Sequence, residues 1–192
     1  MRLLILLFLL MPWSSHAADV EHPIAWDSSF WAGFAGGIIA HELGHVAMAA
    51  SLGQSSRLES GSVVYPNSSF SAKEALRVST AGFQTQWLLS EWAFYEVENP
   101  EETVLDEQHY IGLITAHITI SLAYLAGLKE QPTSDIYNAA AVSGRSRNQL
   151  MAAALAPALL DAYRLWGDAP AWVDKLSIGL KVGEIGLIWT FE

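Results

Sequence analysis

Long apolar stretches separated by short polar connections dominate this chain. Several are long enough for a helix that crosses a hydrocarbon core of about 30 Å, which takes about 20 residues. Four are strongly apolar and a fifth is weaker, and they cover 28–52, 74–97, 109–128, 148–166 and 176–191. The pattern predicts an all-α fold, a polytopic membrane bundle of four to five spans. The core helices of a soluble protein give a similar pattern, so that alternative stays open.

The first apolar run differs from the later ones. Arg2 precedes a run of about 11 apolar residues, which is too short to span a membrane, and the small residues Ser15 and Ala17 follow it. Small residues in this position suit a signal peptidase. We therefore predict a cleaved export signal at 1–17 and a single domain at 18–192, with an uncleaved anchor as the alternative.

Basic residues alternate between the connections. The connection at 96–109 contains no Lys or Arg, whereas the ones before and after it carry three each: Arg57, Lys73 and Arg77, then Lys129, Arg145 and Arg147. Cytoplasmic loops of membrane proteins are enriched in Lys and Arg. This alternation predicts an integral protein of a cell membrane, the inner membrane in a bacterium, with the mature N-terminus outside.

Two connections carry turn signals. After the first apolar stretch, a short extended segment at 62–65 ends at Pro66 and Asn67, which predicts a loop or a β-hairpin. The segment at 129–147 is polar and turn-like around Pro132 and Gly144.

Charge and composition exclude several functions. The chain has 20 acidic and 10 basic residues and a net charge of −10, so it lacks the clustered cations that nucleic acid requires. It has no cysteine, which excludes thiol nucleophiles, disulfides and cysteine-based zinc sites. Any metal site must use His, Asp or Glu.

One motif inside the first apolar stretch carries specific chemistry. His41-Glu42-Leu43-Gly44-His45 has the pattern H-E-x-x-H. On a helix, His41 and His45 project from one face and can bind one Zn²⁺, and Glu42 can accept a proton from water. Two histidines and a glutamate are costly in hydrocarbon unless they are paired or bind a metal. We therefore predict zinc as the cofactor, with a pair of structural histidines as the alternative.

This motif, set in an apolar helix, resembles the zinc motif of the site-2 protease family of intramembrane metalloproteases. The resemblance implies that His41 and His45 are ligands, that Glu42 is the general base, and that an aspartate from a later helix is the third ligand. Leu160-Asp161 matches that later position, although Ala162 replaces the family's glycine. The resemblance therefore implies that Asp161 is the third zinc ligand.

A middle family element is matched less closely. Ala81-Gly82-Phe83 stands where the family has Ala-Gly-Pro, and Gln86 stands where the family has Asn, so the resemblance assigns Gln86 to substrate binding. It also gives the extended segment at 58–70 a role as an edge that receives a substrate strand. His117 and Glu91 remain competitors of Asp161 for the third ligand.

The sequence thus predicts a membrane-embedded zinc endopeptidase that hydrolyses membrane-protein or peptide substrates in a lipid bilayer, and no nucleic-acid partner. Two alternatives remain. One is a secreted soluble or peripheral zincin with Glu91 as third ligand. The other is a non-catalytic membrane scaffold with a structural metal.

Overall fold

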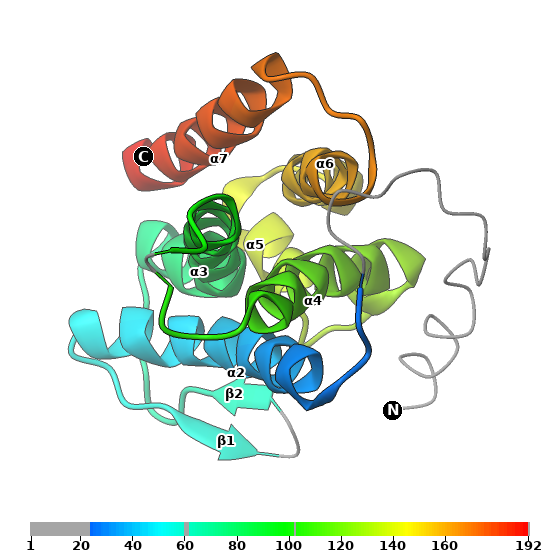
Figure 1. Ribbon diagram of the computed structural model, residues 1–192. Coiled ribbons are helices and arrows are strands. Elements are labelled where there is room, and N and C mark those ends of the chain that lie inside the picture. The colour runs from blue at the N-terminus through cyan, green and yellow to red at the C-terminus, as the bar shows by residue number, and fades with distance from the viewer. Residues whose placement is uncertain (1–23, 60–61, 102, 192) are drawn as a thin grey trace.

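The computed structural model describes residues 24–59, 62–101 and 103–191. The predicted export signal at 1–17 lies outside these residues. The described chain folds into a helical bundle with one small hairpin (Figure 1). In chain order its elements are α2 (Ser28–Ser51), β1 (Arg57–Glu59), β2 (Ser62–Val64), α3 (Ala72–Glu98), α4 (Glu107–Ala126), the 3-10 helix η1 (Leu128–Glu130), α5 (Asp135–Ser143), α6 (Arg147–Trp166) and α7 (Trp172–Thr190).

The predicted all-α class and the hairpin are confirmed. Helices α2, α3, α4, α6 and α7 follow the five apolar stretches. Strands β1 and β2 pair antiparallel, with Leu58 opposite Val63. The short helix α5 was not predicted, and it lies in the connection that the sequence indicated as turn-like. Ser134 starts this helix, because its side chain accepts a hydrogen bond from the Tyr137 N–H, and Gly144 ends it in the left-handed region.

Glycines let α2 approach its neighbours closely. A side chain at Gly33 would overlap the carbonyl oxygen of His109 in α4, and one at Gly44 would overlap Thr85 in α3. From the α4 side, a side chain at Gly112 would overlap the Phe30 carbonyl oxygen. Small residues at such crossings allow backbones to meet. As a result α2, α3 and α4 form the central packing unit, and α6 and α7 cover its other side (Figure 1).

The prediction of four to five membrane spans is not supported. Among the described residues, one helix, α4, is long and apolar enough to cross a membrane. Most of α4 is buried between α2, α3 and α6, and a core helix of a soluble protein passes the same test. The other long helices contain more charged or weakly apolar residues, such as the four glutamates of α3 and the histidines and glycines of α2.

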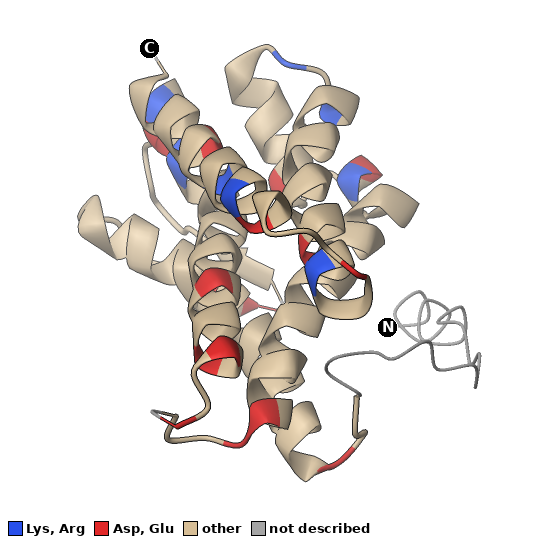
Figure 2. Cartoon of the chain, turned by 45° about the horizontal axis from the view of Figure 1, so that its top comes forward, with Lys and Arg blue, Asp and Glu red and all other residues tan. Residues whose placement is uncertain are grey.

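Charges are unevenly distributed over the bundle. Figure 2 shows acidic residues gathered at the end where α3 ends and α4 begins. The connection between these helices contains no Lys or Arg. The connections therefore differ in charge in the folded molecule as they do in the sequence, and the acidic residues of one connection lie in their own region.

A buried ionic cluster attaches α7 to the rest of the bundle. Lys181 of α7 is 2% exposed, and its ammonium donates to Asp161 Oδ2 at 2.7 Å, to Glu91 Oε1 at 2.5 Å and to Ser90 Oγ at 2.9 Å. Asp161 is fully buried and also accepts from His117 Nδ1 at 3.0 Å. The cluster links α3, α4, α6 and α7, and its charges compensate one another. Buried charges are tolerated only when they are paired in this way.

We expect Lys181→Met to lower the free energy of unfolding by about 3–5 kcal/mol, because it removes the ammonium that contacts both oxygens of the buried Asp161 carboxylate. Lys175→Met is the matched control, since Lys175 is an exposed lysine of the same helix. Denaturant unfolding of both variants measures the difference. Equal stability of the two would contradict a structural role for the cluster.

Candidate metal centre

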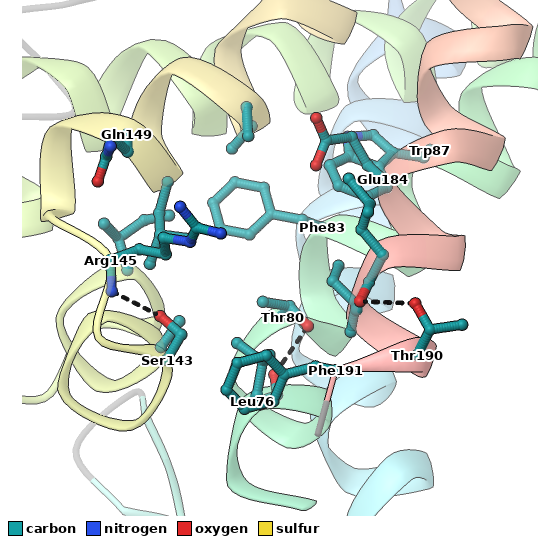
Figure 3. Close-up of a pocket in the computed structure, with 17 residues that line it drawn as sticks. Leu76, Thr80, Phe83, Trp87, Ser143, Arg145, Gln149, Glu184, Thr190 and Phe191 are labelled. Carbon is teal, nitrogen blue, oxygen red and sulfur yellow. Dashed lines mark hydrogen bonds between the residues drawn. The ribbon is translucent and has the colours of Figure 1, made fainter. Parts of the chain in front are cut away.

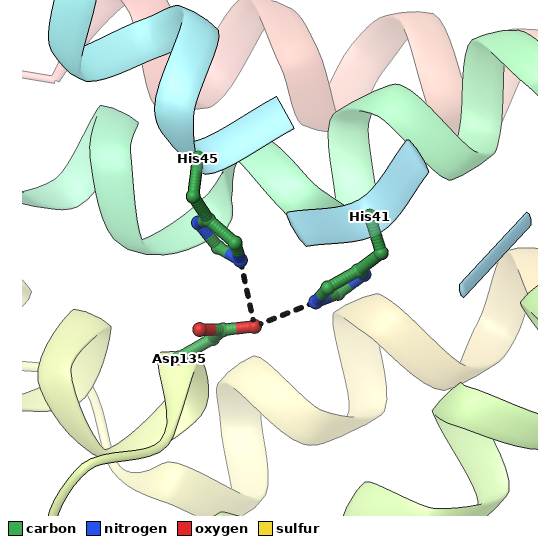
Figure 4. A group of neighbouring side chains, drawn as sticks. All are labelled: His41, His45 and Asp135. Atoms are coloured by element: carbon green, nitrogen blue, oxygen red, sulfur yellow. Dashed lines mark hydrogen bonds and ion pairs between the residues drawn. The ribbon is translucent and has the colours of Figure 1, made fainter. Parts of the chain in front are cut away.

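The two histidines of the motif lie side by side on α2 and face α5. Both are 3% exposed, and their ring centroids are 5.0 Å apart. One helical turn separates them, as the spacing predicts. Opposite them lies Asp135, the first residue of α5, and all three side chains point toward one another (Figure 4).

One oxygen atom of Asp135 is the centre of this group. Its Oδ2 lies 2.9 Å from His41 Nε2 and 3.2 Å from His45 Nε2. The Tyr124 hydroxyl of α4 donates to the same oxygen at 2.7 Å. The potential ligand atoms of His41, His45 and Asp135 all lie within 4.8 Å of one another, so these residues could hold a metal ion.

The remaining ring nitrogens are committed to other partners. His41 Nδ1 donates to Gln86 Oε1 at 3.1 Å, and His45 Nδ1 donates to the backbone carbonyl of Val78 at 2.7 Å. A neutral imidazole that donates from Nδ1 presents a lone pair at Nε2. Both Nε2 lone pairs therefore face a carboxylate oxygen, which is repulsive unless a proton or a metal cation lies among them. Metal-binding histidines commonly have this second hydrogen bond, which fixes their tautomer and orientation.

The electrostatics agree with a cationic centre. The Asp135 side chain is 16% exposed. Burial by itself raises the pKa of this carboxyl, but when no metal is bound a proton supplies the positive charge: a protonated His45 and hydrogen bonds from both imidazoles outweigh burial and hold the pKa of Asp135 well below its usual range. Asp135 is therefore an anion at neutral pH, as a metal ligand must be.

Glu42 lies next to this group without belonging to it. Its side chain is half-buried and interacts electrostatically with His41, His45 and Asp135. Its carboxylate makes no hydrogen bond or ion pair with the described residues. It therefore remains available to accept a proton beside the histidines.

The structure does not bring Asp161 to the histidines. Its carboxylate is held by Lys181, His117 and Ser177, and the acidic group that faces His41 and His45 is Asp135. Asp161 resembled a ligand in sequence because a carboxylate in an apolar helix needs a partner, and here that partner is the Lys181 ammonium. The other two competitors lie in the same cluster: His117 bonds Asp161, and Glu91 bonds Lys181 and Arg164.

Gln86 lies at the centre, where it contacts a histidine. It is 2% exposed, and its Oε1 accepts from His41. The structure therefore places Gln86 against the ring of a candidate ligand, and its assignment to substrate binding stays a prediction. The neighbouring element also contributes, because the missing side chain at Gly82 leaves room for the His41 ring, and Phe83 packs edge-on against that ring at 5.3 Å.

Sequence reasoning missed Asp135 because it lies 90 residues from His45 in a polar connection. The available signal was local. Ser134 followed by Asp135 is typical of a helix start, since Ser is a preferred N-cap and an acidic residue is favoured in the first turn. That signal predicts a short helix here, but not which face of the bundle the helix meets.

No family model, curated protein or solved structure matches the chain. The geometry of the described residues is therefore what supports a metal centre.

We expect Asp135→Asn to weaken zinc binding by more than about 100-fold, because it removes the anionic donor of the set, whereas loss of an outer partner costs about 10–100-fold. Asp161→Asn is the matched comparison and should retain zinc, since Asp161 lies in the other cluster. Zinc content and competition with a chelator measure both. Loss of zinc in Asp161→Asn with retention in Asp135→Asn would reverse the assignment.

Proposed function

We propose that this protein is a zinc-dependent endopeptidase. One observation carries the proposal: His41 Nε2, His45 Nε2 and an Asp135 oxygen converge, and the Glu42 carboxylate lies beside them. Catalytic zinc sites use three protein ligands of these types and leave a position open for water or substrate. The H-E-x-x-H spacing adds the residue that such hydrolases use as a base.

The donor set fits zinc. It combines two imidazole nitrogens with one carboxylate, and it contains no sulfur because the chain has no cysteine. Hydrogen bonds orient each ligand: Gln86 and the Val78 carbonyl hold the two histidines through Nδ1, and Tyr124 donates to the Asp135 oxygen that faces them. A bound zinc ion supplies Lewis acidity, which makes water more acidic and polarises a peptide carbonyl.

The chain's own residues supply the proton transfers. Glu42 accepts a proton from the water that attacks the peptide carbonyl and then delivers a proton to the leaving amine. The hydrogen bonds at His41 Nδ1 and His45 Nδ1 keep both Nε2 lone pairs directed at the ion. The Tyr124 hydroxyl fixes the rotamer of Asp135. Together these contacts hold the ligands before substrate arrives.

The hairpin offers a place for an extended substrate. It packs beside α2 (Figure 1), and an exposed strand edge can pair with the main chain of a peptide. Tyr65, directly after β2, interacts electrostatically with Asp135 and Glu42, so this end of the hairpin lies near the centre. Burial and these two carboxylates raise the pKa of the Tyr65 hydroxyl, which therefore remains a neutral hydrogen-bond donor. Main-chain pairing favours unfolded or extended substrates over a particular sequence.

We expect Glu42→Gln to retain zinc and to lower the rate of peptide hydrolysis by about 10²–10⁴-fold, because the amide cannot accept a proton. His45→Ala should lose both zinc and hydrolysis. An unfolded model protein serves as the substrate, and metal content is measured on the same samples. Undiminished hydrolysis in Glu42→Gln would remove the enzymatic proposal, and zinc retention together with no hydrolysis in the unaltered protein would favour a structural metal instead.

We further propose that the protein is integral to a membrane. Large apolar side chains stand more than half exposed on three neighbouring helices: Ile39 and Leu43 of α2, Leu88 of α3, and Val182 of α7. Exposed apolar surface of this kind is typical of a contact with lipid or with another protein. The alternation of acidic and basic connections along the sequence also supports this proposal, because Lys and Arg are enriched in the cytoplasmic loops of membrane proteins.

We expect the protein to stay with the membrane pellet after alkaline carbonate extraction, because burial of these side chains in lipid is not reversed by pH. Immunoblotting of pellet and supernatant measures the distribution. Full release into the supernatant would favour the soluble or peripheral zincin, with the same residues at the metal centre.

A further inference from the structure

A second site lies on the other side of α3 from the metal centre. A cavity of about 480 Å³ opens between α3, α5, α6 and α7 (Figure 3). Its wall is mainly apolar and includes Leu76, Phe83, Trp87, Ile136, Leu150 and Ala154. Its volume is within the range of about 300–1,000 Å³ that is usual for small-molecule sites.

Two opposite charges line this apolar cavity. Arg145 comes from the connection between α5 and α6, and Glu184 comes from α7. Figure 3 shows them entering from different sides, with Phe83 between them. Neither side chain makes an ion pair or a hydrogen bond with another described residue. By contrast, Arg57, Arg147 and Arg164 all pair with carboxylates.

This arrangement restricts the chemistry of a ligand. Burying an unpaired charge against an apolar molecule is costly. Arg145 is exposed and Glu184 is half-buried, so a neutral apolar ligand would cover Glu184 without pairing it and would leave Arg145 to solvent. An acyl chain with an anionic head would satisfy Arg145 but lay hydrocarbon against Glu184. A molecule with an anionic end, a cationic end and an apolar body satisfies all three parts of the wall.

We propose that this cavity binds a short apolar peptide with free termini, with its carboxylate at Arg145 and its ammonium at Glu184. Arginine pairs well with a carboxylate through two parallel hydrogen bonds, and Glu184 accepts from the ammonium. Leu76, Trp87, Leu150 and the other apolar residues contact the side chains of the peptide. The uncharged polar side chains of the lining already take part in local hydrogen bonds, so the termini are the main determinants; they are Thr80, Ser143, Gln149 and Thr190.

The cavity adjoins the metal centre without sharing its ligands. The Phe83 ring forms part of the cavity wall and also packs against His41, with ring centroids 5.3 Å apart, and against Tyr124 at 5.0 Å. Ile136 of the wall directly follows Asp135. The peptide therefore binds on the far side of Phe83 from the metal-binding residues, and its binding requires neither metal nor catalysis.

The test uses three ligands that differ only at their ends: trileucine, N-acetyl-trileucine and trileucine amide. Binding to the full chain is measured by calorimetry and by the fluorescence of the tryptophans, which include Trp87 in the wall. The same titrations in Glu42→Gln exclude hydrolysis of the ligand, so failure of the proposed peptidase activity would leave this result unaffected. We expect trileucine to bind at least about tenfold more tightly than either blocked form.

The two charges should act separately. Arg145→Gln should remove the preference for the free carboxylate and keep the preference for the free ammonium, and Glu184→Gln should do the opposite. Lys175→Gln, at an exposed position of α7 outside the cavity wall, is the control and should change neither. Equal binding of all three ligands, or tight binding of dodecanoate that Glu184→Gln leaves unchanged, would overturn the proposal.

Discussion

The lone pairs of His41 and His45 face one carboxylate oxygen of Asp135, so a positive charge must lie among them. The arrangement of the bundle around α2 and α5 follows from this requirement. The two Nδ1 atoms are already used, by Gln86 and by the Val78 carbonyl, so the histidines cannot turn away without leaving buried polar groups unpaired. Asp135 is fixed in the same way by Tyr124. A cation, whether a proton or a metal ion, is therefore part of the stable state.

The molecule contains a second group of buried charges that is built differently. Around Asp161 the positive charge comes from Lys181, which is covalently part of the chain, and the carboxylate needs no ion from solvent. Around Asp135 no lysine or arginine of the described residues fills the corresponding place. The contrast explains why the contacts of His41 and His45 with Asp135 have the character of a metal site, whereas the contact between His117 and Asp161 does not.

The sequence predicts more of the local structure than of the long-range contacts. The long apolar stretches predict the five long helices, and the residues around Pro66 and Asn67 predict the end of the hairpin, because these signals lie within one element. The motif His41–His45 predicts two ligands and a base for the same reason. The third position depends on how α5 meets α2 across 94 residues, and no local pattern contains that information. Charged residues inside apolar stretches indicate that a helix is buried, but they do not show whether it is buried in protein or in lipid.

Substrate access to the histidines and peptide binding in the cavity would involve different faces of the molecule. The hairpin lies beside α2, on one side of the histidines, and the cavity lined by Arg145 and Glu184 lies beyond Phe83 on the other. A single aromatic ring thus separates a site that would bind peptides by their ends from one that would cut them. A movement of the Phe83 ring would change its contacts with both His41 and Tyr124.

One turn of α3 contacts both histidines. The two contacts restrict the amino-acid sequence of α3 in different ways. The Val78 carbonyl accepts from His45, and four residues later the bare backbone of Gly82 leaves space for the His41 ring. The first contact is made by the main chain, so many apolar side chains could occupy position 78 without altering it. The second depends on the lack of a side chain, so even a methyl group at position 82 would displace the imidazole. Two positions of similar importance to the site would therefore diverge at very different rates among descendants of this chain.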